Sequence, residues 1–183
     1  MTALGAFGIS GLAGAAEYGL PLLVQAETRT PDVIFVPTPN HVVNKMLDMA
    51  AVTAQDVVYD LGCGDGRIVI TAAQRYGARG VGIDIDPERI REANDNLKRT
   101  KVAGKVKFIQ GDLFTADISE ATVVTLYLLT GLNLKLRPKL MQDLQPGTRV
   151  VSHAFAMGDW KPERSEDVNG SPVYLWRIPP RKA

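Results

Sequence analysis

The chain has 183 residues, the usual size of one domain, so two full domains are not expected. Hydrophobic residues make up 45% of it and charged residues 22%, which excludes an intrinsically disordered or fibrous protein. Lys and Arg number 21 against 20 Asp and Glu, and this near-neutral balance predicts no nucleic-acid partner. The single cysteine, Cys63, excludes an intrachain disulfide, and one Cys with two His predicts no metal site of the Cys-rich zinc type.

The N-terminal region differs from the rest of the chain. Residues 1–32 are predicted to be a hydrophobic, glycine-rich leader or arm that precedes a domain over residues 33–183. Residues 1–26 contain no Lys or Arg and one acid, Glu17, and their regularly spaced glycines make a poor helix in water. Two interpretations stay open: an arm that packs loosely or only against a partner, or the hydrophobic stretch of an export signal or membrane anchor over residues 3–26.

From residue 33 onward the chain alternates predicted helices and strands. In its first half, the pattern predicts a helix from a Thr38-Pro39 cap, a strand over 57–61, a glycine turn and helix over 62–76, a strand over 80–84, and a helix from an Asp86-Pro87 cap. In its second half, the pattern predicts strands over 106–109 and 123–129, a helix from Pro138, and strands over 149–155 and 172–178. Such alternation predicts an α/β fold with a mostly parallel sheet and helices on both faces.

The glycine turn after the first strand is the predicted ligand site. Ligands of such sheets bind at the carboxyl ends of the strands, and Gly62 and Gly64 let the backbone approach a ligand closely. Asp84 ends the second strand, where a carboxylate can accept hydrogen bonds from both hydroxyls of an adenosine ribose. The alternative for Asp84 is a turn or cap residue, but Asp86 fills the cap better because Pro87 follows it directly.

Two cofactors fit these residues, a nicotinamide dinucleotide and S-adenosylmethionine. The dinucleotide fingerprint requires a third glycine where Arg67 stands. Asp60, two residues before Gly62, suits a ligand with a free α-amino group, such as the methionine part of S-adenosylmethionine. Past the third strand, Asp112 can accept from an adenine amino group while Leu113 or Phe114 packs on the ring; the alternative is a plain Gly-Asp turn. Together these residues favour a methyltransferase.

The sequence resembles the class I S-adenosylmethionine-dependent methyltransferases, and more narrowly the bacterial relatives of mitochondrial protein-lysine methyltransferases that act on the c-subunit of ATP synthase and the adenine nucleotide translocase. The resemblance implies a Rossmann-like, mostly parallel sheet of about seven strands with an antiparallel last strand. It also implies that Thr38 lies over the methionine end of the cofactor. Because the connection after the strand at 149–155 is short and polar, one strand is expected to be a stub. The motifs are 35–39 (FVPTP), 60–69 (DLGCGDGRIV), 82–84 (GID), 111–113 (GDL) and 150–152 (VVS).

The acceptor is less well defined. Where many amine methyltransferases carry Asn/Asp-Pro-Pro-Tyr after the fourth strand, this chain has Tyr127-Leu128-Leu129-Thr130. The resemblance favours a protein lysine as the methyl acceptor, and a membrane protein is one such substrate. A small-molecule or lipid methyltransferase and a catalytically silent cofactor-binding partner subunit stay open. Tyr127 and Asn133 are candidates to line the acceptor slot, and His153 to take a proton or to be a buried structural histidine.

The cofactor bears on where the protein acts. The need for S-adenosylmethionine favours a cytoplasmic or membrane-associated protein, with the export signal at residues 1–26 as the alternative.

Overall fold

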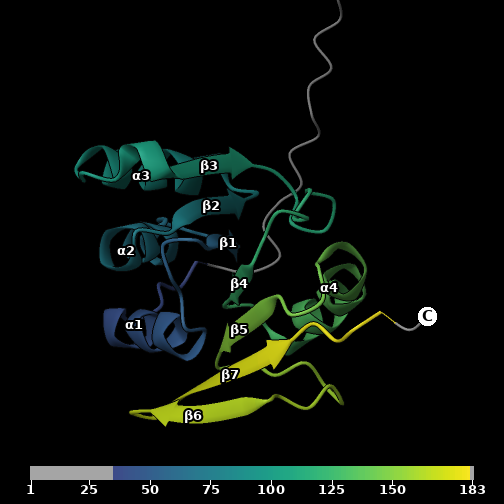
Figure 1. The fold of residues 1–183 in the computed structure, drawn as a ribbon. Helices are drawn as coiled ribbons and strands as arrows, with labels where there is room; N and C mark the ends of the chain where they lie inside the picture. The colour runs from purple at the N-terminus through teal and green to yellow at the C-terminus, as the bar shows by residue number, and fades with distance from the viewer. Residues whose placement is uncertain (1–34, 182–183) are drawn as a thin grey trace, which may run out of the picture.

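The computed structural model describes residues 35–181, so the predicted arm over residues 1–32 lies outside the described part of the chain. Seven strands form one sheet in the order β3-β2-β1-β4-β5-β7-β6 (Figure 1). The first five strands are parallel, whereas β7 is antiparallel to β5 and β6 is antiparallel to β7, as predicted for the end of the sheet. The strands are β1 (Val57–Leu61), β2 (Arg79–Asp84), β3 (Val106–Gln110), β4 (Val123–Leu126), β5 (Arg149–His153), β6 (Arg164–Val168) and β7 (Ser171–Arg177).

Four α-helices cover the two faces of this sheet. The helices α1 (Asn40–Met49), α2 (Arg67–Tyr76) and α3 (Pro87–Lys98) lie on one face, and α4 (Thr130–Asp143) lies on the other (Figure 1). A short 3₁₀ turn, Ala103–Lys105, precedes β3. Alternate residues of the strands point to opposite faces, so the sheet contributes side chains to two separate hydrophobic cores. Val58, Val123 and Val151 pack with α1 and α2, whereas Tyr59 and Val124 pack on the α4 side.

The strand order determines where the sheet leaves room for a ligand. From β1 the chain moves outward through β2 to β3, and it then returns to the other side of β1 to form β4. The loops that follow β1 and β4 therefore diverge, which opens a crevice at the carboxyl ends of these strands. Both the glycine turn after Leu61 and the segment after Leu126 reach this crevice.

The strand β6 corrects the prediction of a stub. The sequence pattern places residues 164–168 in a short polar connection, but they form a five-residue edge strand. Its sequence, RSEDV, has no apolar alternation, because an edge strand at the surface carries charges that discourage pairing with other molecules. The strand is recruited by its pairing with β7, from Arg164 opposite Leu175 to Val168 opposite Ser171.

The start of α4 corrects a second prediction, and β4 is shorter than expected. The helix begins at Thr130 rather than at Pro138, which lies inside it, and β4 ends at Leu126. A proline inside a helix removes one backbone hydrogen bond and is costly. Here Leu136 and Leu140 are fully buried against the sheet while Pro138 is exposed, so packing of the inner face compensates for the proline on the outer face.

No helix within residues 35–181 has the length and apolar character needed to cross a membrane. The predicted membrane association through residues 3–26 concerns a segment outside the described residues.

Candidate functional site

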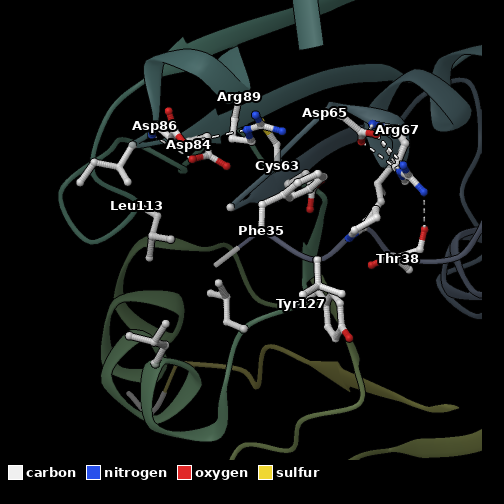
Figure 2. A pocket seen from close by; sticks show the side chains of 18 of the residues that line it. Phe35, Thr38, Cys63, Asp65, Arg67, Asp84, Asp86, Arg89, Leu113 and Tyr127 are labelled. Carbon is white, nitrogen blue, oxygen red and sulfur yellow. Dashed lines mark hydrogen bonds and ion pairs between the residues drawn. The ribbon is translucent and has the colours of Figure 1, made fainter. Parts of the chain in front are cut away.

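A cavity of about 710 Å³ lies at the carboxyl ends of β1, β2, β3 and β4 (Figure 2). Most of the residues predicted to bind the cofactor line it, and so does one of the three predicted catalytic residues. Gly64 lies under the ring of Phe35 instead of facing the open space. The predicted residues that line the cavity are Thr38, Asp60, Gly62, Asp84, Asp112, Leu113 and Tyr127.

The glycine turn has a backbone that other residues rarely adopt. Gly62 has φ 84° and Gly64 has φ 52°, both in the left-handed region that favours glycine. A Cβ atom at Gly64 would lie 2.0 Å from the ring of Phe35, so a side chain there would collide. The turn leads directly into α2 at Arg67, and the N-terminus of a helix favours a ligand with negative charge. Cys63, inside the turn, is buried, and burial raises the pKa of its thiol, so it stays neutral.

Asp84 lines the cavity, and both of its carboxylate oxygens accept hydrogen bonds from backbone N–H groups. Its Oδ2 accepts a hydrogen bond of 2.8 Å from the backbone N–H of Gly64, and its Oδ1 accepts one of 3.0 Å from that of Asp86. The prediction that Asp86 caps the next helix is confirmed, because its carboxylate accepts from the N–H of Glu88 at 2.8 Å. Asp84 is thus not the cap, but its bond from the Asp86 N–H is a turn contact, the other alternative for this residue, and it fixes the loop at the edge of the cavity.

Asp60 is a buried carboxyl at the end of β1. Burial raises its pKa to about 8; the hydrogen bond from the Thr125 hydroxyl, 2.8 Å long, works against this, and the charges of Asp84 and Asp65 add to it. The pKa of Asp60 is thus set by its burial and by two neighbouring acids. A positively charged ligand group beside Asp60 would stabilise its carboxylate. As a hydrogen-bond acceptor, the Asp60 carboxylate suits the α-amino group of S-adenosylmethionine, which donates.

The loop after β3 forms the apolar end of the cavity. The Asp112 carboxylate accepts a hydrogen bond of 2.8 Å from the backbone N–H of Phe114, which closes a local turn. Leu113 and Phe114 also line the cavity. The geometry therefore contains both the plain turn and the apolar surface that an adenine ring needs.

Tyr127, His153 and Thr38 form a contiguous cluster at the opposite end. The rings of Tyr127 and His153 stack with centroids 3.9 Å apart, and the hydroxyl of Thr38 lies 3.4 Å from Nδ1 of His153. His153 is buried behind Tyr127 and does not line the cavity. Burial lowers its pKa, as does the charge of His41, so it is neutral near pH 7. Thr38 does not cap α1, whose N-cap is Pro39; its side chain reaches His153 instead.

Asn133 lies on α4, away from the cavity. It is fully buried, and its Nδ2 donates to the Ser152 hydroxyl at 3.3 Å and to the Phe155 carbonyl at 3.1 Å. These bonds fix the turn that follows β5, where Ala154 has φ 64°. Asn133 is not among the residues that line the cavity, and its role in lining the acceptor slot stays a prediction.

Phe35, Arg67 and Arg89 are among the cavity residues to which the sequence assigned no role. Phe35 lies over Gly64, and the Arg89 guanidinium is 5.1 Å from the centroid of the Phe35 ring (Figure 2). Arg67, on the other side of Phe35 in this view, is hydrogen-bonded to Asp65. In the sequence, Arg67 excludes the dinucleotide fingerprint and belongs to the motif over residues 60–69, but neither observation predicts its contacts, and Arg89 occupies an ordinary surface position of a helix.

Comparison with known proteins agrees with this site. The family model of the ANTKMT methyltransferase domain matches residues 60–164, more than half of the chain. The chain belongs to the ANTKMT methyltransferase family. The resemblance to the class I S-adenosylmethionine-dependent methyltransferases is thereby confirmed.

Two relatives of this methyltransferase are named for lysine methylation. A protein from Saccharolobus islandicus (strain REY15A), named Protein-lysine N-methyltransferase, is 51% identical over 153 residues, which cover 81% of this chain and 95% of that protein. A Homo sapiens protein, named as the lysine N-methyltransferase of the ATP synthase C-subunit, is 30% identical over 129 residues, 70% of this chain and 54% of the human protein.

One solved structure shares both the sequence and the fold. It is described as an RNA methyltransferase from Salinibacter ruber in complex with S-adenosyl-L-homocysteine, with 59% identity and a TM-score of 0.79, and the match covers 81% of this chain and 97% of that one. The predicted Rossmann-like fold and the predicted cofactor, S-adenosylmethionine, are confirmed for this family member.

Proposed function

We propose that this methyltransferase transfers a methyl group from S-adenosylmethionine to a lysine amine of a protein. The observation that carries the proposal is the relative named Protein-lysine N-methyltransferase, which is 51% identical to the chain and is covered almost completely by the match. The human relative named for lysine methylation supports the same acceptor class.

The residues of the cavity are suited to hold the cofactor in one orientation. Asp60 would hold the α-amino group, Asp84 the ribose, and Leu113 with Asp112 the adenine. Bound there, S-adenosylmethionine supplies a methyl group activated by a positively charged sulfonium. The glycines of the turn have no side chains, so the backbone of the turn can approach the ligand closely.

The other end of the cavity has the character that an amine acceptor needs. A lysine amine must lose a proton before it can attack, against a reference pKa of about 10.4. Val36, Leu128 and Leu132 line the cavity with apolar surface, which disfavours the charged ammonium form. The ring of Tyr127 is fixed by its stack on His153, so its hydroxyl can orient the amine only from a defined position. Water can take the proton, because His153 does not line the cavity and can be reached from it only through the Thr38 hydroxyl.

A labelling experiment with native substrates tests the acceptor. The purified enzyme and labelled S-adenosylmethionine are added to an extract of the cells that make it, with the Asp84→Ala variant as a cofactor-binding control. We expect label that protease removes and ribonuclease does not, and methylated lysine after acid hydrolysis of the labelled band.

RNA is a second candidate acceptor because the relative from Salinibacter ruber is described as an RNA methyltransferase. The balance of 21 basic and 20 acidic residues does not favour broad binding to phosphates. Label in the ribonuclease-sensitive fraction, with none on protein, would refute lysine methylation and leave the methyltransferase assignment intact.

A further inference from the structure

The side chain of Arg67 joins two parts of the chain that meet at the cavity. Its Nε donates to both carboxylate oxygens of Asp65 at 3.0 Å, and its Nη2 donates to Oδ2 at 2.6 Å. Its Nη1 donates to the backbone carbonyl of Thr38 at 3.0 Å. Figure 2 shows this arrangement, with Arg67 between Asp65 above it and Thr38 below it. The guanidinium therefore bonds at once to the glycine turn and to the segment before α1.

The Asp65 end of this link is firmly anchored. Asp65 is a buried carboxylate in the glycine turn, and its backbone carbonyl accepts a hydrogen bond of 3.0 Å from Nδ2 of Asn96 on α3. The Asp65 carboxylate also accepts from the backbone N–H of Arg67 at 3.2 Å. A planar guanidinium with two parallel bonds to a carboxylate has little rotational freedom, so its remaining N–H groups point in fixed directions.

The Thr38 end of this link belongs to a segment that forms a wall of the cavity. All of residues 35–38 line the cavity, and the ring of Phe35 lies on Gly64. Among the hydrogen bonds within residues 35–181, the one from Arg67 to Thr38 alone joins this segment to the glycine turn. The other polar contact of the segment runs from the Thr38 hydroxyl to His153, on the far side. The placement of Phe35 over the turn therefore depends on Arg67 through the Thr38 carbonyl, beside the direct contact of the Phe35 ring with the Arg89 guanidinium.

We infer that Arg67 is a positioning residue for the cofactor, which acts by docking residues 35–38 onto the glycine turn. The inference rests on the cofactor-binding part of the proposed function and not on the acceptor. Without the docking bond, binding of the cofactor has to order four residues that are already ordered in the parent protein, and this loss of entropy lowers the affinity. A lysine cannot replace the arginine, because one ammonium group does not supply the fork that bonds Asp65 and the Thr38 carbonyl in parallel.

The test measures the affinity for S-adenosylhomocysteine by titration calorimetry, which requires no acceptor and no turnover. We expect Arg67→Ala to weaken binding by about tenfold or more, the size expected for a hydrogen bond made by a charged group. Arg67→Lys should also bind more weakly than the parent. The matched control is Arg75→Ala on the same helix, whose partner Asp48 is exposed and which does not line the cavity.

A double-mutant cycle separates positioning from direct contact with the ligand. If Arg67 acts through Phe35, adding Arg67→Ala to Phe35→Ala should cost much less affinity than Arg67→Ala costs alone. At saturating cofactor, turnover of Arg67→Lys should approach the parent value while its KM for the cofactor stays raised. Additive losses, or an Arg67→Lys protein that binds as tightly as the parent, would overturn the inference. A parent protein that binds no S-adenosylhomocysteine would instead refute the proposed function itself.

Discussion

Replacing Asp60 with asparagine tests whether the buried carboxyl recognises the positive end of the cofactor. Burial raises the pKa of this group to about 8, so most copies are protonated at pH 7. An ammonium group binds the carboxylate and not the neutral acid, so binding near pH 7 must release a proton. In Asp60→Asn, the new amide keeps an oxygen that can accept from the Thr125 hydroxyl, but it cannot become charged.

The size of the effect follows from the proton balance. Below a pKa of about 8, each pH unit makes ionisation of Asp60 tenfold less favourable, which is about 1.36 kcal/mol. The affinity for S-adenosylhomocysteine should therefore rise about 50-fold between pH 6 and pH 8 in the parent protein, as the linkage relation requires. The Asp60→Asn protein should bind more weakly at pH 8, and its affinity should be nearly flat over the same range.

Titration calorimetry in two buffers of different ionisation enthalpy measures both quantities. The parent should release close to one proton for each ligand bound near pH 6.5, and the variant should release none. Because any titration of the ligand itself appears in both proteins, the difference between them isolates Asp60. A parent affinity that does not change between pH 6 and pH 8, or a variant that keeps the full slope, would refute the assignment.

The same variant should change stability in the opposite direction. The raised pKa means that the folded chain prefers protonated Asp60, so this contribution to stability is fully present below the unfolded pKa of 3.8 and is lost as the pH rises through about 8. Near pH 8, Asp60→Asn should therefore raise the free energy of unfolding, by about 1–3 kcal/mol for an imperfectly satisfied buried group. Thermal unfolding without ligand measures this gain. A destabilised variant at pH 8 would show that the carboxylate is better solvated than its burial implies.

Three other predictions can be checked on the same protein. Asp84→Ala should weaken S-adenosylhomocysteine binding by about 1–3 kcal/mol. Asp86→Ala should instead cost only about 1 kcal/mol of stability, because it removes a helix cap. If titration and melting showed weak binding for Asp86→Ala and only lost stability for Asp84→Ala, the ribose assignment would be wrong. In initial rates against pH at saturating cofactor, Tyr127→Phe should lower turnover more than His153→Ala does. The decrease for His153→Ala should stay well below the roughly 100-fold typical of a missing general base. Parent-like rates for Tyr127→Phe would remove its hydroxyl from the mechanism. Deletion of residues 1–26 should leave a folded protein that binds S-adenosylhomocysteine, and an insoluble or non-binding product would place the arm in the core.

The sequence was sufficient to place most of the predicted cofactor-binding residues at one cavity. The glycine turn, Asp60 and Asp84 are defined by short-range signals, because each lies at the end of a strand whose apolar residues are contiguous in the chain. The Asp86 cap followed from a single dipeptide with Pro87. Once the sheet was predicted to be parallel, these strand ends had to meet at one edge, and the cavity lies there.

Element boundaries that depend on packing were predicted less well. The helix α4 continues through Pro138 because the burial of Leu136 and Leu140 outweighs an unfavourable local residue. The strand β6 has no apolar signal of its own and exists because β7 offers a free edge to pair with. In both cases the deciding energy comes from partners elsewhere in the chain.

The contacts that complete the cavity were decided by the tertiary structure alone. Phe35 lies on Gly64, and Thr38 contacts His153 across 115 positions of the chain. The bond from Arg67 to the Thr38 carbonyl spans 29 positions. Such contacts have no local periodicity, since they depend on how the segment before α1 crosses the ends of β1 and β5. The sequence by itself determined which residues lie at the carboxyl ends of the strands, because strand ends and glycine turns are local signals. Folding decided which contacts join the walls of the cavity, because those contacts arise only when distant segments pack together.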